Sequence, residues 1–252
     1  MQSNELLTAT NLRADKKPPP IASLKHLIGF LLIGVGLVVL GLLAQHAPTE
    51  GAGGASTGQL GRHSQAIHIY LFAILGDWAI LYYCWAGVHR RGGNLKTLSG
   101  GRWTSWKSLV TDLAIALPFW VLWEATAYGV YRLLGPSTAK SLDSLLPKSL
   151  LEILIWIGTS ITAGICEEMA FRGYLQQQFH ALTGSVVMAV LCQGAVFGLF
   201  HFYQGWKNVI VIVVLGVLFG ALAAWRRNLR ANIIVHAWGD IWSGWLRSIV
   251  WR

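Results

Sequence analysis

Charged side chains are scarce in this sequence. Only 12% of the 252 residues are Asp, Glu, Lys or Arg, whereas 54% are apolar, and the mean hydropathy is +0.50. A soluble domain of average composition carries about 25% charged residues. The apolar residues also gather in blocks, several of which reach the roughly 20 residues that a helix needs to cross a bilayer. The composition therefore argues against an ordinary soluble protein and predicts an integral membrane protein.

Cysteine is equally scarce, and two common catalytic motifs are missing. The three cysteines, Cys84, Cys166 and Cys192, lie inside apolar stretches and form no CxxC pair. They therefore indicate neither a disulfide framework nor a cysteine metal site, and we expect them to serve in packing. The sequence also lacks the HExxH motif of zinc proteases and the GxSxG elbow of serine hydrolases.

Seven apolar blocks predict membrane-spanning helices. Each block is too long for a strand, and none has the ten-residue alternation of a transmembrane barrel. Backbone groups in the bilayer core must be satisfied within the segment, which requires helices. We therefore predict an all-α fold, a polytopic transmembrane bundle of about seven helices. The blocks run roughly over residues 26–47, 67–88, 109–134, 150–175, 185–203, 209–225 and 231–250.

The chain divides into three predicted parts. Residues 1–25 are polar and contain a Lys-Lys-Pro-Pro-Pro run, which is typical of a flexible tail. Residues 26–147 hold the N-terminal transmembrane helices. Residues 148–252 hold the remaining helices, together with the polar clusters described below.

The net charge of +9 reflects membrane topology in this interpretation. The Lys and Arg residues lie between the apolar blocks, so we expect membrane lipid as a partner and no nucleic acid. With a cytoplasmic N-terminus, the inside segments hold twelve Lys and Arg residues and the outside segments hold seven. The positive-inside rule therefore favours that orientation, in a multi-pass protein of the cell (plasma) membrane.

Three polar clusters interrupt the apolar pattern of the C-terminal half. Ionisable groups inside membrane spans are costly, so they usually face a cavity and serve a function. The clusters are Glu167-Glu168-Met-Ala-Phe-Arg172, Phe197-Gly-Leu-Phe-His201 and Asn232-Ile-Ile-Val-His236-Ala-Trp-Gly-Asp240.

Helical spacing predicts how these side chains point. Glu168 and Arg172 are four residues apart, so they share a helix face and can form an ion pair. Glu167 lies about 100° around the same helix and can point elsewhere. His236 and Asp240 also share a face, where a carboxylate one turn away can orient an imidazole. Asn232 lies one turn earlier on that face.

Two chemistries could use this set of residues, and both lead to peptide-bond hydrolysis. In the first, a glutamate deprotonates water with help from a histidine, while other polar groups stabilise the oxyanion. In the second, a zinc ion lowers the pKa of a bound water. The zinc ligands would then be Glu167, His201, His236 and Asp240.

Together the three clusters resemble the CPBP family (CAAX protease and bacteriocin-processing), also called the ABI family, of intramembrane endopeptidases, which includes the CAAX prenyl endopeptidases. The family pattern is EExxxR, FxxxH and HxxxN or HxxxD on successive hydrophobic helices. Here it reads Glu167-Glu168-x-x-x-Arg172, Phe197-x-x-x-His201 and His236-x-x-x-Asp240. The resemblance covers about residues 150–245 and makes 148–252 the expected catalytic core.

The resemblance implies a role for each residue. Glu167 and His201 would activate water, Glu168 and Arg172 would brace the site, and His236 with Asp240 would form the oxyanion-binding side. An ionised Asp240 can only accept hydrogen bonds, unlike the Asn of other members. Either Asp240 is protonated, or it orients His236, or a metal is present. The expected cofactor is accordingly none or zinc.

The predicted function is hydrolysis of membrane-associated or lipidated peptide and protein substrates near the bilayer. Two alternatives remain: a non-proteolytic member of the same fold, such as an immunity factor or scaffold, and a transporter that relays protons. Three further acidic residues fall in the N-terminal helices. Asp112 is near a span end and suits an interfacial position, whereas Asp77 and Glu124 have no assignment.

Overall fold

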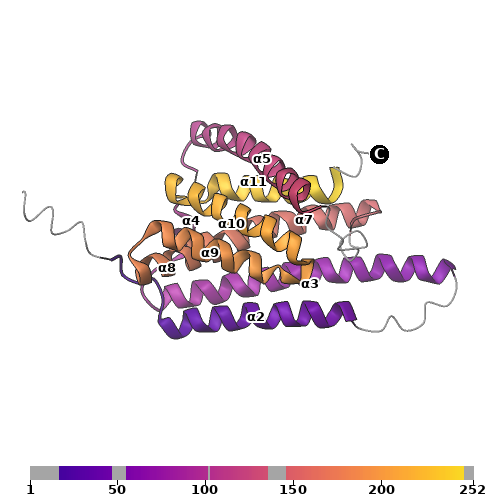
Figure 1. Cartoon of the computed structure of the whole chain (residues 1–252), viewed down its shortest axis with the longest axis horizontal. Coiled ribbons are helices and arrows are strands. Elements are labelled where there is room, and N and C mark those ends of the chain that lie inside the picture. The colour runs from indigo at the N-terminus through magenta and orange to yellow at the C-terminus, as the bar shows by residue number, and fades with distance from the viewer. Residues whose placement is uncertain (1–16, 47–54, 102, 136–145, 247–252) are drawn as a thin grey trace, which may run out of the picture.

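The protein is an all-α bundle in the computed structural model, which describes residues 17–46, 55–101, 103–135 and 146–246. Only the backbone is described for residues 44–46, 55–65 and 245–246. Figure 1 shows the helices lying along one long axis, with α5 inclined across one side. In chain order the elements are α2 (Leu24–His46), α3 (Ala55–His89), α4 (Leu95–Ser99), α5 (Trp106–Leu134), α7 (Leu150–Glu167), η1 (Glu168–Leu175), α8 (Gln176–Thr183), α9 (Val186–Phe200), η2 (Phe202–Gln204), α10 (Trp206–Arg226), α11 (Arg230–Ile241) and η3 (Trp242–Leu246).

The predicted fold class is confirmed, because the described part of each of the seven apolar blocks is helical, apart from Ser185 and His201 on either side of α9. Among the described residues, five segments are long and apolar enough to cross a membrane: Leu24–Leu43, Ala66–His89, Trp106–Leu134, Leu150–Thr183 and Trp206–Arg226. The fourth of these joins α7, η1 and α8 into 34 continuous residues. The fifth block contains the shorter apolar helix α9, and the seventh comprises α11 and η3, with its last residues outside the described part.

The outer surface of the bundle is apolar, as lipid contact requires. Large side chains such as Phe72, Leu75 and Leu133 are 68%, 70% and 86% exposed. In water such a surface would drive aggregation, whereas in a bilayer it meets hydrocarbon. The exposed side chains are therefore consistent with an integral membrane protein.

Helices α9 and α10 pack closely through glycine. A Cβ atom placed on Gly216 would lie 2.9 Å from the Cα atom of Gly194, and a Cβ on Gly198 would lie 2.9 Å from the backbone N of Val213. Only glycine leaves room for such an approach, and close contact is how helices associate without a hydrophobic driving force. This contact fixes the position of the turn that follows α9.

The end of the bundle that contains α4 is held by polar contacts. Asp112, at the start of α5, is fully buried and accepts hydrogen bonds from Arg226 Nη2 at 2.8 Å and Arg230 Nε at 2.7 Å. It also accepts from Trp103 Nε1 at 3.0 Å. These contacts tie α5 to the turn between α10 and α11. Asp112 is therefore a buried carboxylate with two partly buried cationic partners, at the span end where the sequence analysis expected an interfacial carboxylate.

The described part of the predicted N-terminal tail lies against α8. Lys17 Nζ donates to the Leu182 carbonyl at 3.0 Å. The side chain of Gln178 accepts from the Ala22 N–H at 3.3 Å and donates to the Ala22 carbonyl at 3.1 Å. Residues 1–16 of that predicted tail lie outside the described residues.

Candidate active site

The first polar cluster lies at a change in helix type. Glu167 is the last residue of α7, and Glu168 begins the π-helical segment η1, in which every residue is buried. Segments with i→i+5 hydrogen bonds are rare and are often found at functional sites. Gly173 contributes to the local structure, because a Cβ atom there would collide with the carbonyl oxygen of Leu98 in α4. The glycine thus lets α4 pack directly against the π-helical segment.

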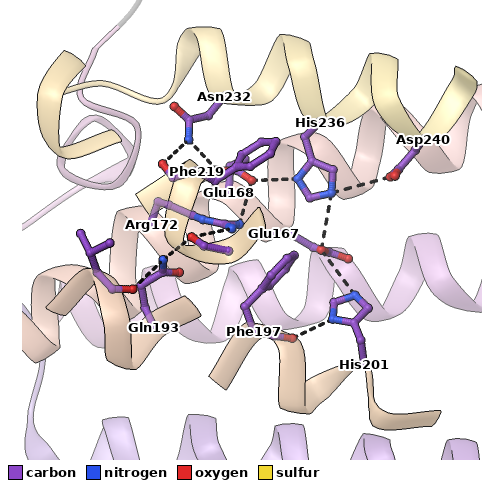
Figure 2. Close-up of polar contacts among 12 residues, drawn as sticks. Glu167, Glu168, Arg172, Gln193, Phe197, His201, Phe219, Asn232, His236 and Asp240 are labelled. Atoms are coloured by element: carbon purple, nitrogen blue, oxygen red, sulfur yellow. Dashed lines mark hydrogen bonds and ion pairs between the residues drawn. The ribbon is translucent and has the colours of Figure 1, made fainter. Parts of the chain in front are cut away.

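Glu168 is the centre of a buried hydrogen-bond network. Its Oε1 atom accepts from Arg172 Nη1 and from His236 Nδ1, each at 2.8 Å. Its Oε2 atom accepts from Asn232 Nδ2 at 3.1 Å. The predicted ion pair between Glu168 and Arg172 is therefore present, and it also holds two side chains of α11 (Figure 2).

The guanidinium of Arg172 lies between two aromatic rings. Its Cζ atom is 4.3 Å from the ring centroid of Phe197 and 5.1 Å from that of Phe219. Such cation–π contacts are strongest where water is excluded. Arg172 Nη2 also donates to the Gly216 carbonyl at 3.4 Å, and the same oxygen accepts from Gln193 Nε2 at 2.7 Å. Arg172 therefore anchors η1 to α9 and α10.

His201 follows α9 and has a defined orientation. Its Nδ1 atom lies 2.8 Å from the Phe197 carbonyl, which can only accept, so Nδ1 carries the proton. The Nε2 atom of the neutral ring is then a lone-pair acceptor. Its ring is stacked near Tyr203, with centroids 6.1 Å apart. Tyr203 lies outside the candidate spans, and burial raises the pKa of its phenol, so the hydroxyl stays protonated.

The four predicted catalytic side chains meet at one point. Glu167 Oε2 lies 4.0 Å from His201 Nε2 and 3.7 Å from His236 Nε2. The same His236 atom lies 3.7 Å from Asp240 Oδ2. Figure 2 shows Glu167 between the two histidine rings, with Asp240 beyond His236 on the same helix. The structure thus brings together residues of α7, α11 and the turn after α9.

These four atoms all have acceptor character. The carboxylates of Glu167 and Asp240 accept only, and both imidazole Nδ1 atoms already donate to other groups. A cluster of mutually facing acceptors is favourable only when a proton donor lies between them, such as water or a protonated ring. The arrangement is therefore suited to holding and deprotonating a water molecule.

The same set can be tested as zinc ligands. Donor atoms about 2.1 Å from a tetrahedral zinc ion lie roughly 3.4 Å from one another. The observed separations of 3.7, 3.7 and 4.0 Å are wider. Within the described residues, no group of three or more His, Cys, Asp or Glu side chains is arranged to hold a metal ion. The residues as they stand do not fit zinc, and metal dependence stays a prediction.

Asp77 lies near this centre, a relationship that sequence reasoning missed. It is close enough for electrostatic interaction with Glu167, His236 and Asp240. The helical periodicity of α3 could have revealed this position, because Asp77 shares a face with the residues of α3 that pack inward. The buried residues of that face are Ala66, Tyr70, Leu81, Cys84 and Val88. We assign no role to Glu124, which lies on α5.

One comparison with known proteins identified a family. Residues 149–242 match the family model described as type II CAAX prenyl endopeptidase Rce1-like. Neither the curated proteins nor the solved structures gave a match. The resemblance that the three motifs predict is confirmed for this segment, which contains all of the converging side chains.

Proposed function

We propose that this chain is an intramembrane endopeptidase that hydrolyses membrane-associated or lipidated substrates with a water molecule activated by Glu167 and His201. The observation that carries the proposal is the convergence of Glu167 Oε2, His201 Nε2 and His236 Nε2 within 4.0 Å. The match of residues 149–242 to the CAAX endopeptidase model supports a protease of this type.

The spacing of Glu167 and His201 suits one shared water molecule. Two acceptors that each lie about 2.8 Å from a water oxygen, in its two O–H directions, are roughly 4.4 Å apart. The observed separation of 4.0 Å is close to this value. The water would donate one hydrogen to each group and present its lone pair to the substrate carbonyl. As the C–O bond forms, the Glu167 carboxylate takes the proton.

His236 would stabilise the charge that develops on the carbonyl oxygen. In its doubly protonated form, its Nδ1–H is held by Glu168, and its Nε2–H can donate to the oxyanion. Asp240, 3.7 Å from that nitrogen, would favour the charged ring and fix its direction. When the tetrahedral intermediate collapses, Glu167 returns its proton to the leaving amine as the C–N bond breaks.

Glu168, Arg172, Asn232 and Phe197 would act by positioning. Glu168 holds the His236 ring, while Arg172 and Asn232 hold the Glu168 carboxylate. Phe197 fixes His201 through its carbonyl oxygen. Because the three contacts of Glu168 are buried and that of His201 is partly buried, the catalytic side chains would need little reorganisation during the reaction.

We further propose that the reaction takes place at the membrane. Substrates would be peptides or proteins held at the membrane, in an enzyme of the plasma membrane with a cytoplasmic N-terminus. The metal-free route is the one we favour. The zinc route predicted from the sequence is the alternative that the experiment below tests.

A decisive experiment compares purified wild type with Glu167→Gln and His201→Ala on a panel of membrane-tethered peptides, with and without a zinc chelator. A matched control is His180→Ala, because His180 lies near the end of α8, on the same continuous helical segment as Glu167 but about 20 Å along its axis at about 1.5 Å per residue. We expect both site variants to lose at least about a hundredfold in kcat/KM, the scale of general-base catalysis. The control should keep wild-type turnover.

Three outcomes of this cleavage experiment would contradict the proposal or change its mechanism. Equal cleavage by wild type and both site variants would reject the proposed centre. Complete loss of wild-type cleavage with the chelator, restored by added zinc, would replace the metal-free route with the zinc route. If intact wild type cleaves no peptide of the panel, the non-proteolytic or transporter alternatives would be favoured.

A further inference from the structure

One end of the bundle carries a dense set of exposed cations with no exposed acidic residue among the described residues. We call this set the basic surface: Lys17, Lys25, Arg90, Arg91, Lys96, Lys107 and Arg227. The acidic residue described at this end is Asp112, which is fully buried and already bonded to Arg226 and Arg230. Within the described residues, the positive charge of the surface is therefore left uncompensated.

Contacts between distant segments place these cations at the same end (Figure 1). The N–H of Leu229 donates to the Ser99 carbonyl at 3.0 Å, which joins the turn after α10 to the end of α4. A Cβ atom on Gly100 would lie 2.6 Å from the Arg227 carbonyl. Because Lys17 donates to Leu182 at the end of α8, the N-terminal cations lie there too.

Helix α4 and the turn before it hold the backbone of Arg90, Arg91 and Lys96 in a defined position. Helix α4 begins with a capping box between Asn94 and Thr97 and ends at Gly100 in the left-handed conformation, φ 73°. Leu98 is 1% exposed, and Gln177 Nε2 donates to the Thr97 carbonyl at 3.1 Å. The backbone that carries the cations is thus fixed before any ligand binds, which lowers the entropic cost of binding.

Exposed tryptophans mark the depth of this end in the membrane. Trp103, Trp106 and Trp225 are 44%, 71% and 69% exposed, and in the sequence Trp106 adjoins Lys107 while Trp225 lies two residues before Arg227. Indole rings favour the level of the lipid headgroups, with the apolar ring toward hydrocarbon and the N–H toward water. The basic surface therefore lies at the level of the headgroups.

We propose that the basic surface binds the anionic headgroups of phospholipids, with Arg90, Arg91 and Lys96 as its centre. Arginine and lysine side chains beside interfacial tryptophans bind phosphate oxygens, and the excess negative charge of an anionic leaflet strengthens this attraction. A zwitterionic headgroup offers the phosphate without net charge. Binding should therefore be selective for anionic lipid.

The test uses the full chain in nanodiscs of phosphatidylcholine alone, or of equal parts phosphatidylcholine and phosphatidylglycerol. Lipids retained by the protein are counted by native mass spectrometry, and the unfolding midpoint is measured in both bilayers. The test variant is Arg90→Gln/Arg91→Gln/Lys96→Gln. The matched control is Arg132→Gln/Lys148→Gln, which removes exposed cations from the opposite end.

We expect wild type and the control to retain phosphatidylglycerol preferentially and to unfold at a higher temperature in the mixed bilayer. The triple variant should lose both effects, with selectivity weakened by roughly a hundredfold for three interfacial charges. Unchanged selectivity in the triple variant, or equal loss in the control, would overturn the proposal. Equal stabilisation by soluble polyglutamate in pure phosphatidylcholine would assign the surface to an acidic protein instead. Both readouts are independent of peptide hydrolysis.

Discussion

Glu168 accepts a hydrogen bond from His236 at 2.8 Å, and this contact joins the π-helical segment η1 to α11. The same carboxylate oxygen is bonded to Arg172, also at 2.8 Å. One buried carboxylate thus both neutralises a buried guanidinium and sets the direction of an imidazole. The stability of the bundle and the geometry of the site therefore depend on the same group.

Removing Glu168 should destabilise the protein strongly. Glu168→Ala leaves Arg172 fully buried without its ionic partner, and breaking such a pair costs about 3–5 kcal/mol. The loss can be measured as a fall in the free energy of unfolding in detergent. The double variant Glu168→Leu/Arg172→Met should recover much of it, because no unpaired charge then remains. Equal destabilisation in the single and double variants would contradict this account.

The sequence predicted the helices well because bilayer length and composition impose strong constraints. Every predicted block is helical over nearly all of its described residues, and the motif spacing correctly predicted the Glu168–Arg172 contact. The helix α4 was not predicted, because its five residues contain neither a long apolar run nor a clear period. The π-helical hydrogen bonds of η1 were also beyond prediction, since composition does not distinguish i→i+5 from i→i+4 pairing.

Contacts between residues far apart in the sequence limited how much of the candidate site could be predicted. Residue spacing identified Glu167, His201, His236 and Asp240, but their convergence depends on tilts and on the glycine contacts between α9 and α10. Asp77 had no local partner in the sequence, because its neighbours belong to other helices. The catalytic roles of Glu167, His201, His236 and Asp240 stay predictions.

Asp240 offers a test of whether the site needs a charge or a hydrogen-bonding group at that position. Asp240→Asn should keep kcat/KM within about tenfold, because an amide can still orient His236 and the family pattern admits Asn. Asp240→Ala removes both functions and should cost roughly 10²-fold or more, comparable with the loss of an oxyanion-stabilising group. Steady-state cleavage of a membrane-tethered peptide gives both values. If the two variants lose equally, the carboxylate charge itself is required.

Two glycines of α2 allow a matched comparison of packing beside His201. A Cβ atom on Gly34 would collide with the ring of Phe200, the residue before His201, whereas one on Gly36 meets nothing within 4 Å. Gly34→Ala should therefore cost about 1–3 kcal/mol of unfolding free energy through overpacking. Gly36→Ala should be neutral or stabilising by up to about 1 kcal/mol.

The Gly34 effect should also reach the site. Displacement of Phe200 would move the turn that carries His201, so we expect kcat to fall in Gly34→Ala and to stay unchanged in Gly36→Ala. The double variant Gly34→Ala/Phe200→Leu makes room for the new methyl group and should recover part of both losses. Failure of the smaller side chain to rescue either quantity would show that α2 does not act through this contact.

Asp112 has cationic hydrogen-bond partners, whereas Asp77 has no hydrogen bond or ion pair within the described residues. Replacing each with leucine should therefore have opposite effects on stability. Asp112 is fully buried and accepts from Arg226 and Arg230. Asp112→Leu should therefore cost about 2–3 kcal/mol, since it removes the buried carboxylate that accepts hydrogen bonds from both guanidinium groups. The measurement is thermal or denaturant unfolding against wild type in the same detergent.

Asp77 faces inward from α3 and, within the described part of the chain, has no hydrogen bond or ion pair. Replacing it with leucine removes an uncompensated polar group, which typically yields about 1–3 kcal/mol. We therefore expect Asp77→Leu to raise the unfolding midpoint while it lowers kcat/KM, because the carboxylate interacts with Glu167, His236 and Asp240. Such a gain in stability at the expense of activity is typical of functional polar residues. A loss of stability in Asp77→Leu would instead identify Asp77 as a structural residue of the bundle.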